Sequence, residues 1–114
     1  KGVELIVGSK HDASFGKVLV FGLGGVFVEL LKERAIRVLP VSKKELREMV
    51  RETKAYAFVK GYRNQWISEK RIVGLLEKTG RMLEENDGIE ELDFNPVIAN
   101  GEELWVADAR IVFG

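Results

Sequence analysis

The sequence predicts an α+β fold, in which a mostly antiparallel sheet carries two helices on one face. Apolar residues alternate with a period of two in the first third of the chain, which is typical of strands. Helical spacing then replaces this pattern, and strand alternation returns around a hairpin signal near the C-terminal end. The predicted order is strand, strand, strand, strand, helix, helix, strand, strand. This order favours helices layered on one face of a sheet.

Four short strands are expected before the first helix. The segment "GVELIVG" at residues 2–8 alternates apolar and other residues. Three further β-rich runs follow, namely "KVLVFG" (17–22), "GVFVELL" (25–31) and "AIRVLP" (35–40). Glycine and polar residues separate the runs, so we expect an antiparallel meander. The chain opens within a strand pattern, and we therefore expect residues 1–114 to be a single unit of a larger protein.

Two helices are expected in the middle of the chain. Ser42 and Glu45 have the spacing of a capping box, and Leu46, Met49 and Val50 follow at helical spacing.

The segment "GYRNQW" (61–66) is expected to be a loop. Ser68 is expected to cap the second helix, and Gly88 to end it in a left-handed conformation. The apolar stripe of that helix comprises Ile72, Leu75, Leu76, Thr79 and Leu83.

The composition excludes several classes of function. The chain has 114 residues, of which 46% are hydrophobic and 32% are charged, as in one soluble globular domain. Its 18 basic residues balance its 18 acidic ones, so no overall charge favours nucleic acid or a membrane surface as partner. The absence of cysteine excludes disulfides and thiol chemistry, and it fits a cytoplasmic location. High Lys, Glu and Arg content also favours a thermophilic source.

The closing hairpin, residues 91–110, collects polar side chains that strands seldom carry. A two-residue turn at Asn100-Gly101 is expected to pair residue 99 with 102. This register would put Asp93 opposite Asp108, and Asn95 opposite Val106. Because side chains alternate, one face would carry Asp93, Asn95, Asp108 and Arg110. The other face would be the core side, with Leu92, Phe94, Trp105, Ala107, Ala109 and Ile111.

Two interpretations of the polar face are open. Facing carboxylates repel each other, and the oxygen ligands on this face suit a hard cation such as Mg²⁺, which completes its shell with phosphate oxygens and water. Such a site would neutralise charge during phosphoryl transfer. Alternatively, Arg110 balances the aspartates on a solvated face. Composition alone favours this second interpretation.

Other residues carry weaker signals. The segment "FGLGG" holds Gly22, Gly24 and Gly25, whose backbone N–H groups could approach an anion, although on the segment alone a tight hairpin turn is the favoured explanation. The single histidine, His11, is expected in an exposed polar turn, and no catalytic triad can be argued from it.

Several of these segments together resemble a known family. The segments "GVELIVG", "DASFGKVLVFGLGGVFVELL", "RVLPVSKKELREMV", "ELDFNPV" and "VADARI" are similar, in this order, to the NDP-forming acyl-CoA synthetases. The resemblance is strongest to the C-terminal half of the ATP-grasp domain in the β subunit of ADP-forming acetate–CoA ligase. Succinyl-CoA synthetase is a more distant relative. The fold implied is the C-terminal ATP-grasp subdomain.

The resemblance implies roles for particular residues. Asn95 and Asp108 match the residues that hold Mg²⁺ on the nucleotide phosphates, and Asp93 matches an acidic residue at the phosphoryl-transfer centre. Arg110 matches a position that is usually basic, and we assign it to catalysis with Asp93. The nucleotide contacts implied are Glu4, Gly22, Gly24, Gly25 and Arg37.

The implied activity is that of an acid–thiol ligase with ATP or ADP and Mg²⁺ as cofactors. A phosphohistidine on a CoA-binding α component would deliver its phosphoryl group to ADP held here. The N-terminal ATP-grasp subdomain would supply the other half of the nucleotide site, so this chain alone should be inactive. Two alternatives are a non-catalytic interaction module and another ATP-grasp ligase such as succinyl-CoA synthetase.

Overall fold

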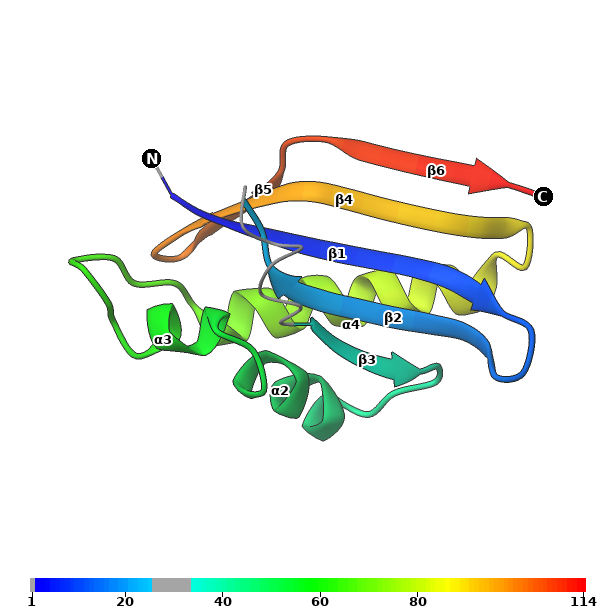
Figure 1. Ribbon diagram of the computed structural model, residues 1–114, viewed down its shortest axis with the longest axis horizontal. Coiled ribbons are helices and arrows are strands. Elements are labelled where there is room, and N and C mark those ends of the chain that lie inside the picture. The colour runs from blue at the N-terminus through cyan, green and yellow to red at the C-terminus, as the bar shows by residue number, and fades with distance from the viewer. Residues whose placement is uncertain (1, 26–33) are drawn as a thin grey trace.

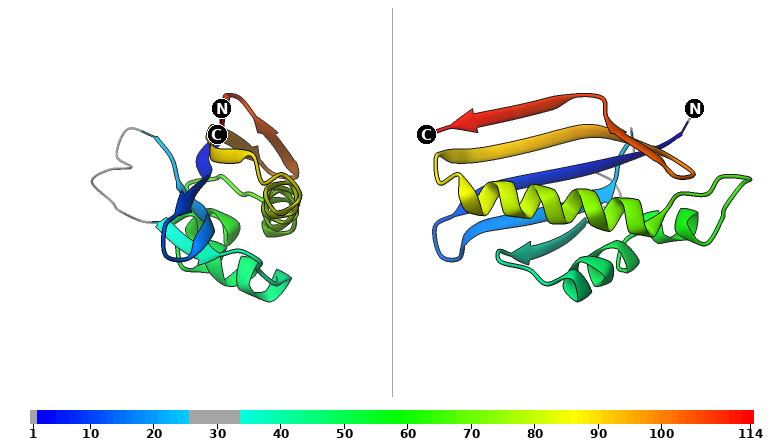
Figure 2. Two further views of the ribbon diagram at one scale, coloured as in Figure 1. Left: turned by 90° about the vertical axis from the view of Figure 1, so that its right-hand side faces the viewer. Right: turned by 180° about the vertical axis from the view of Figure 1, so that it is seen from behind.

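A computed structural model describes residues 2–25 and 34–114 of the chain. Its strands form one sheet in the order β3-β2-β1-β4-β5, with β6 paired to β4 as well, and each named pairing is antiparallel. Helices α2 and α4 cover one face of this sheet (Figures 1 and 2). The elements are β1 (Val3–Asp12), β2 (Gly16–Leu23), β3 (Arg34–Val38), α2 (Lys43–Arg51), α3 (Ala55–Val59), α4 (Glu69–Glu85), β4 (Ile89–Asn100), β5 (Glu103–Val106) and β6 (Ala109–Phe113).

The predicted α+β class and the helices on one face are confirmed. The strand expected at 25–31 lies almost entirely outside the described residues. Two details differ from the expected order. A separate short helix, α3, follows α2, and the last strand is divided into β5 and β6.

The helix starts follow the local sequence closely. Ser42 Oγ accepts the backbone N–H of Glu45 at 3.1 Å, and the Glu45 carboxylate accepts the N–H of Ser42 at 2.9 Å. Ser68 Oγ accepts the N–H of Arg71 at 3.2 Å. Both predicted caps are confirmed, because a cap needs only residues within the first turn.

The end of α4 differs from the prediction. Asn86 is the C-cap with φ −132°, and Gly88 is not among the residues with positive φ, so the predicted left-handed glycine was wrong. The last carbonyl groups are satisfied from elsewhere in the molecule. Lys17 Nζ, on β2, donates to the carbonyl oxygens of Leu83 at 2.8 Å and Asn86 at 2.7 Å. A lysine from the sheet therefore replaces the glycine motif at this helix end.

The hydrophobic core lies between the sheet and its helices. On β1 the odd-numbered residues Leu5 and Val7 point into it, where they join Phe21 of β2, Met49 of α2 and Leu76 of α4. Each of these side chains is almost fully buried. Burial of such a side chain contributes about 1.5–3 kcal/mol, so this layer holds the helices on the sheet. The even-numbered residues of β1 therefore point away from the helices, toward what we call the outer face.

The register of the closing hairpin corrects our prediction. Asn100 pairs with Glu103, so the turn residues are Gly101 and Glu102 rather than Asn100 and Gly101. Gly101 takes the positive φ of +60° that the turn requires. The whole register is therefore displaced by two residues, and since side chains repeat every two residues, the predicted polar face is kept while its pairs change.

A β-bulge interrupts β4 at Asn95 and Pro96, which together lie opposite the single residue Ile6 of β1. Proline has no N–H to donate, and proline inside sheets is commonly found at such bulges.

The predicted core side of the hairpin is only partly correct. Leu92 is buried and Phe94 is half-buried, but Trp105 is 47% exposed and Ile111 is 38% exposed. Ala107 and Ala109 are exposed as well. Trp105 pairs with Ile98, beyond the bulge, where the sides of the strand have exchanged. Ala109 and Ile111 lie on β6 at the sheet edge, past the cover of α4 (Figure 2).

Candidate functional site

A backbone hydrogen bond joins the two residues predicted to be metal ligands. The backbone N–H of Asn95 donates to the carbonyl oxygen of Asp108 at 3.1 Å. The two residues therefore lie side by side between the β4–β5 and β4–β6 pairings, and Val106 pairs with Val97 rather than with Asn95 as the sequence predicted. Each adjoins a member of the Phe94–Ala109 pair on the helix side, so alternation puts both side chains on the opposite face. An amide and a carboxylate, both on exposed residues, thus lie next to each other on the outer face.

The two predicted catalytic residues form the neighbouring pair. Asp93 lies directly opposite Arg110, not opposite Asp108 as predicted. The argument from repulsion between facing aspartates was therefore wrong, because an acidic residue faces a basic one here. Asp93 is flanked on its other side by Gly8 of β1. The outer face thus has two adjacent rows, which hold Asn95 with Asp108 and Asp93 with Arg110.

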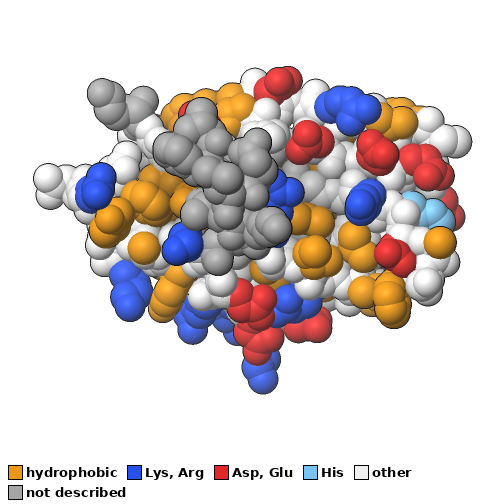
Figure 3. Space-filling view, viewed as in Figure 1, with side chains coloured by type: hydrophobic (Ala, Val, Ile, Leu, Met, Phe, Trp, Pro, Cys, Tyr) orange, Lys and Arg blue, Asp and Glu red, His pale blue; other side chains and the backbone are white. Residues whose placement is uncertain are grey.

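Both carboxylates of these rows lack an ion pair within the part of the chain that the structure describes. Arg110 Nη1 lies 3.5 Å from Glu91 Oε1, with both side chains more than half exposed. Such a surface pair is weak and leaves the guanidinium able to turn toward a ligand. In Figure 3, acidic and basic side chains lie side by side over the upper part of the outer face.

Three of the predicted nucleotide contacts meet at one end of the sheet. The N–H of Gly24 donates to the carbonyl oxygen of Glu4 at 2.7 Å, and Gly25 follows with φ +100°. A Cβ at Gly24 would lie 3.3 Å from the Glu4 backbone, which is tighter than most such contacts, so glycine suits this close approach. A hollow of about 420 Å³ is lined by Gly2, Val3, Glu4, Leu23, Gly24, Gly25, Phe58 and Gln65.

The remaining glycine of "FGLGG" belongs to the sheet rather than to a loop. Gly22 lies on β2 between Ile6 of β1 and Arg34 of β3. Ile6 is also the residue opposite the Asn95 bulge. Gly22 is therefore in the same cross-strand row as the Asn95 and Asp108 pair.

Arg37 is not brought to the outer face. It lies on the helix side of β3, where its guanidinium donates to both carboxylate oxygens of Glu52, next to the end of α2. This hydrogen bond is the main reason that the pKa of Arg37 is raised above its ordinary value. The structure therefore separates Arg37 from the other predicted site residues and gives it a partner between sheet and helix.

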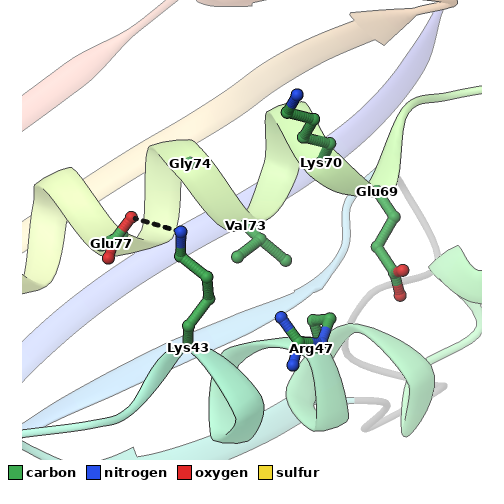
Figure 4. Close-up of a pocket in the computed structure, with 7 residues that line it drawn as sticks. All are labelled: Lys43, Arg47, Glu69, Lys70, Val73, Gly74 and Glu77. Atoms are coloured by element: carbon green, nitrogen blue, oxygen red, sulfur yellow. Dashed lines mark ion pairs between the residues drawn. The ribbon is translucent and has the colours of Figure 1, made fainter.

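A second hollow, between α2 and α4, lies on the helix side (Figure 4). It measures about 290 Å³ and is lined by Lys43, Arg47, Glu69, Lys70, Val73, Gly74 and Glu77. Its two carboxylates are engaged, since Glu69 pairs with Arg51 at 2.8 Å and Glu77 lies 3.9 Å from Lys43. This groove is remote from the polar rows, because α4 and the sheet lie between them.

Sequence reasoning missed Gly8, which lies beside Asp93 on the outer face. The available signal was a glycine inside a strand pattern, which often marks close approach of another group. His11 is exposed, as expected, but it lies within β1 rather than in a turn.

Comparisons with known proteins give the family. A family model described as ATP-grasp domain matches residues 1–113. The chain belongs to the ATP-grasp family. Residues 1–113 cover nearly all of the chain, so the predicted family is confirmed.

Individual ATP-grasp relatives are similar over the whole chain. The chain is 46% identical to acetate–CoA ligase [ADP-forming] II of Archaeoglobus fulgidus, covering 100% of this chain and 17% of that protein. It is 40% identical to the β subunit of the corresponding ligase of Pyrococcus furiosus, covering 97% of this chain and 49% of the subunit. The chain thus spans about half the length of the Pyrococcus subunit and less than a fifth of the Archaeoglobus protein.

A solved structure has nearly the same fold. It is acetyl-coenzyme A synthetase 1 of Ca. Korarchaeum cryptofilum, with a TM-score of 0.94, 43% identity, and coverage of 100% of this chain and 54% of that one. That protein is described in complex with coenzyme A and Mg-AMPPCP, with a phosphohistidine segment pointing towards the nucleotide binding site.

Among the described residues, none of the helices has the length and apolar character needed to cross a membrane.

Proposed function

We propose that this ATP-grasp chain forms the phosphate-binding half of a nucleotide site in an ADP-forming acyl-CoA synthetase. The observation that carries the proposal is the Asn95–Asp108 pair on the outer face, beside Asp93 and Arg110. Its likeness to ADP-forming acetate–CoA ligases supports the same assignment. The reaction converts acyl-CoA, ADP and phosphate reversibly into acid, CoA and ATP, as an acid–thiol ligase does.

The residues present fit a magnesium ion. Mg²⁺ takes oxygen ligands, and it commonly binds one or two protein groups and completes its shell with phosphate oxygens and water. The Asn95 amide oxygen and the Asp108 carboxylate are such ligands, and a backbone hydrogen bond of 3.1 Å keeps the two residues together. When bound, the ion would neutralise charge on the phosphate oxygens.

The chain's own residues then act on the phosphoryl group. In the step toward ATP, the phosphorus–nitrogen bond of a phosphohistidine breaks as a bond forms to the terminal oxygen of ADP. The released imidazole nitrogen takes up one proton from water. Arg110 stabilises negative charge on the transferring group, and Asp93, directly opposite, favours the position of that guanidinium over the outer face.

Nucleotide contacts come from the end of the sheet where the glycines lie. Glu4, Gly24 and Gly25 line the hollow there, and Gly22 adds a flat backbone in the row of Asn95. Arg37 is excluded from the proposed site because its guanidinium is held by Glu52 on the helix side.

The proposal needs two partners. An N-terminal ATP-grasp subdomain would complete the nucleotide site, and an α component that binds CoA would carry the phosphohistidine. The chain alone should therefore be inactive. We place this activity in the cytoplasm, where its nucleotide and CoA substrates occur.

The test uses the complete synthetase, with Asn95→Ala and Asp108→Ala as variants. We expect each to lower phosphoryl transfer to ADP by at least about 100-fold, because the charge on the phosphates would lose its fixed counterion. Single-turnover transfer from phosphorylated α component measures this, and circular dichroism checks the fold. Glu103→Ala, which removes an exposed carboxylate elsewhere in the hairpin, should transfer at the normal rate. Normal transfer in both site variants would refute the assignment.

A further inference from the structure

No contact among the described residues requires glycine at position 8. It lies in the middle of β1, between the buried residues Val7 and Ser9, where glycine weakens a strand. It is not among the residues with positive φ, so its backbone is one that other residues adopt. A Cβ built at Gly8 would meet one described atom within 4 Å, the carbonyl oxygen of Leu92 at 3.4 Å, which is ordinary contact.

The position of Gly8 in the sheet points instead to a ligand that needs the space a side chain would fill. In the sheet Gly8 pairs with Val20 on one side and with Asp93 on the other, and Asp93 pairs in turn with Arg110. Two residues earlier on β1, Ile6 lies opposite the Asn95 bulge. Gly8 therefore leaves bare backbone on the outer face beside both polar rows. A side chain there would stand between Val20 and Asp93, over the surface that a ligand of these rows must reach.

We propose that Gly8 is a positioning residue that keeps the outer face open, so that a phosphoryl group in transfer can reach Asp93 and Arg110. This inference rests on the proposed function. The balanced step is the one already given, in which phosphorus exchanges its bond to imidazole nitrogen for a bond to ADP oxygen. Gly8 takes no part in bond making, and it acts only by leaving space for that geometry.

The phosphoryl group that passes over Gly8 could be presented by either of two molecules. One is the nucleotide, whose terminal phosphates would lie against the bare backbone. The other is the histidine segment of the α component, which in the Korarchaeum relative points towards the nucleotide binding site. Both present the same chemistry to Asp93 and Arg110, so the experiment has to separate them.

The experiment compares Gly8→Ala and Gly8→Val in the complete synthetase. We expect Gly8→Val to slow single-turnover transfer from phosphorylated α component to ADP by about 100-fold, as displacement of reacting groups by about 1 Å does. The smaller Gly8→Ala should fall between this variant and the original protein. The melting temperature should stay level or rise, because valine favours a strand more than glycine does.

The stability measurement separates positioning from a structural role. Loss of transfer with an unchanged or raised melting temperature supports the proposal, whereas loss together with a lowered melting temperature overturns it. Full transfer in Gly8→Val overturns it as well. Gly74→Ala on α4 is the matched control, since a Cβ there meets no described atom within 4 Å and lies on the helix side, so its transfer rate should be normal.

Two further readouts complete the design. A weaker affinity of Gly8→Val for Mg-ADP would assign the effect to the nucleotide phosphates, and an unchanged affinity with slow transfer would assign it to the histidine segment. If Asn95→Ala loses transfer while Gly8→Val retains it, only the present inference fails. If the unmodified synthetase transfers no phosphoryl group, both proposals fail.

Discussion

At the scale of single residues, Lys17 joins the sheet to a helix end. Its Nζ donates to two of the last carbonyl oxygens of the α4 end, those of Leu83 and Asn86. A cation at a helix C-terminus interacts favourably with the partial negative charge there. Lys17 therefore contributes both hydrogen bonds and a favourable charge interaction, and it explains why the end of α4 needs no left-handed glycine.

We predict that Lys17→Met lowers the free energy of unfolding by about 1–2 kcal/mol, because two charge-assisted hydrogen bonds are lost while the aliphatic stem is kept. Urea denaturation followed by circular dichroism measures the change. Lys10→Met, an exposed lysine on the same hairpin, should change stability by no more than about 0.5 kcal/mol. Equal effects of the two substitutions would contradict the proposed cap.

At the scale of single elements, the helix starts were predictable and the hairpin pairs were not. The bonds between Ser42 and Glu45 involve residues three positions apart, so the local sequence determines them. The pairs of the hairpin depend on whether Gly101 is the first or the second residue of the turn, and the local sequence allows both. Gly101 also forms a bridge to Ile67, a contact far away in the sequence that no local pattern reveals.

For the candidate site, the sequence predicted which residues share a face but not which residues pair. Alternation assigned Asp93, Asn95, Asp108 and Arg110 to one face, and an error of two residues in register leaves this assignment unchanged. The individual pairs required the true turn. Arg37 was assigned to the nucleotide by family resemblance, whereas its partner Glu52 on the helix side could be found only from the three-dimensional arrangement.

Helix α4 carries a glycine that its packing does not require. Gly74 lies in the middle of the helix, and a Cβ there meets no described atom within 4 Å. Alanine has a higher helix propensity than glycine by about 1 kcal/mol. We predict that Gly74→Ala raises the free energy of unfolding by about 0.5–1 kcal/mol, as measured by urea denaturation. A loss of stability would mean that the groove between α2 and α4 needs the space.

At the scale of the whole molecule, the hydrophobic core and the candidate site lie on opposite faces of the sheet. The helix side holds the continuous core, and the outer face holds the polar rows. Trp105 is exposed because it pairs with Ile98 beyond the β4 bulge, where side chains that would have faced the helices lie on the outer face. The alternation pattern could not predict this, since the bulge depends on the pairing of β4 with β1, a segment far away in the sequence.

This division leads to a prediction for the core itself. Leu76 on α4 is fully buried, and it belongs to the core with Leu5, Phe21 and Leu92 from three strands. Leu76→Ala should lower the free energy of unfolding by about 2–5 kcal/mol, because the lost contacts leave a cavity that the sheet cannot fill. Thermal and urea unfolding measure the loss. Phe15→Ala removes a larger side chain that is 68% exposed, and it should cost no more than about 0.5 kcal/mol. A similar cost for both would show that the layer between α4 and the sheet is not what holds the molecule together.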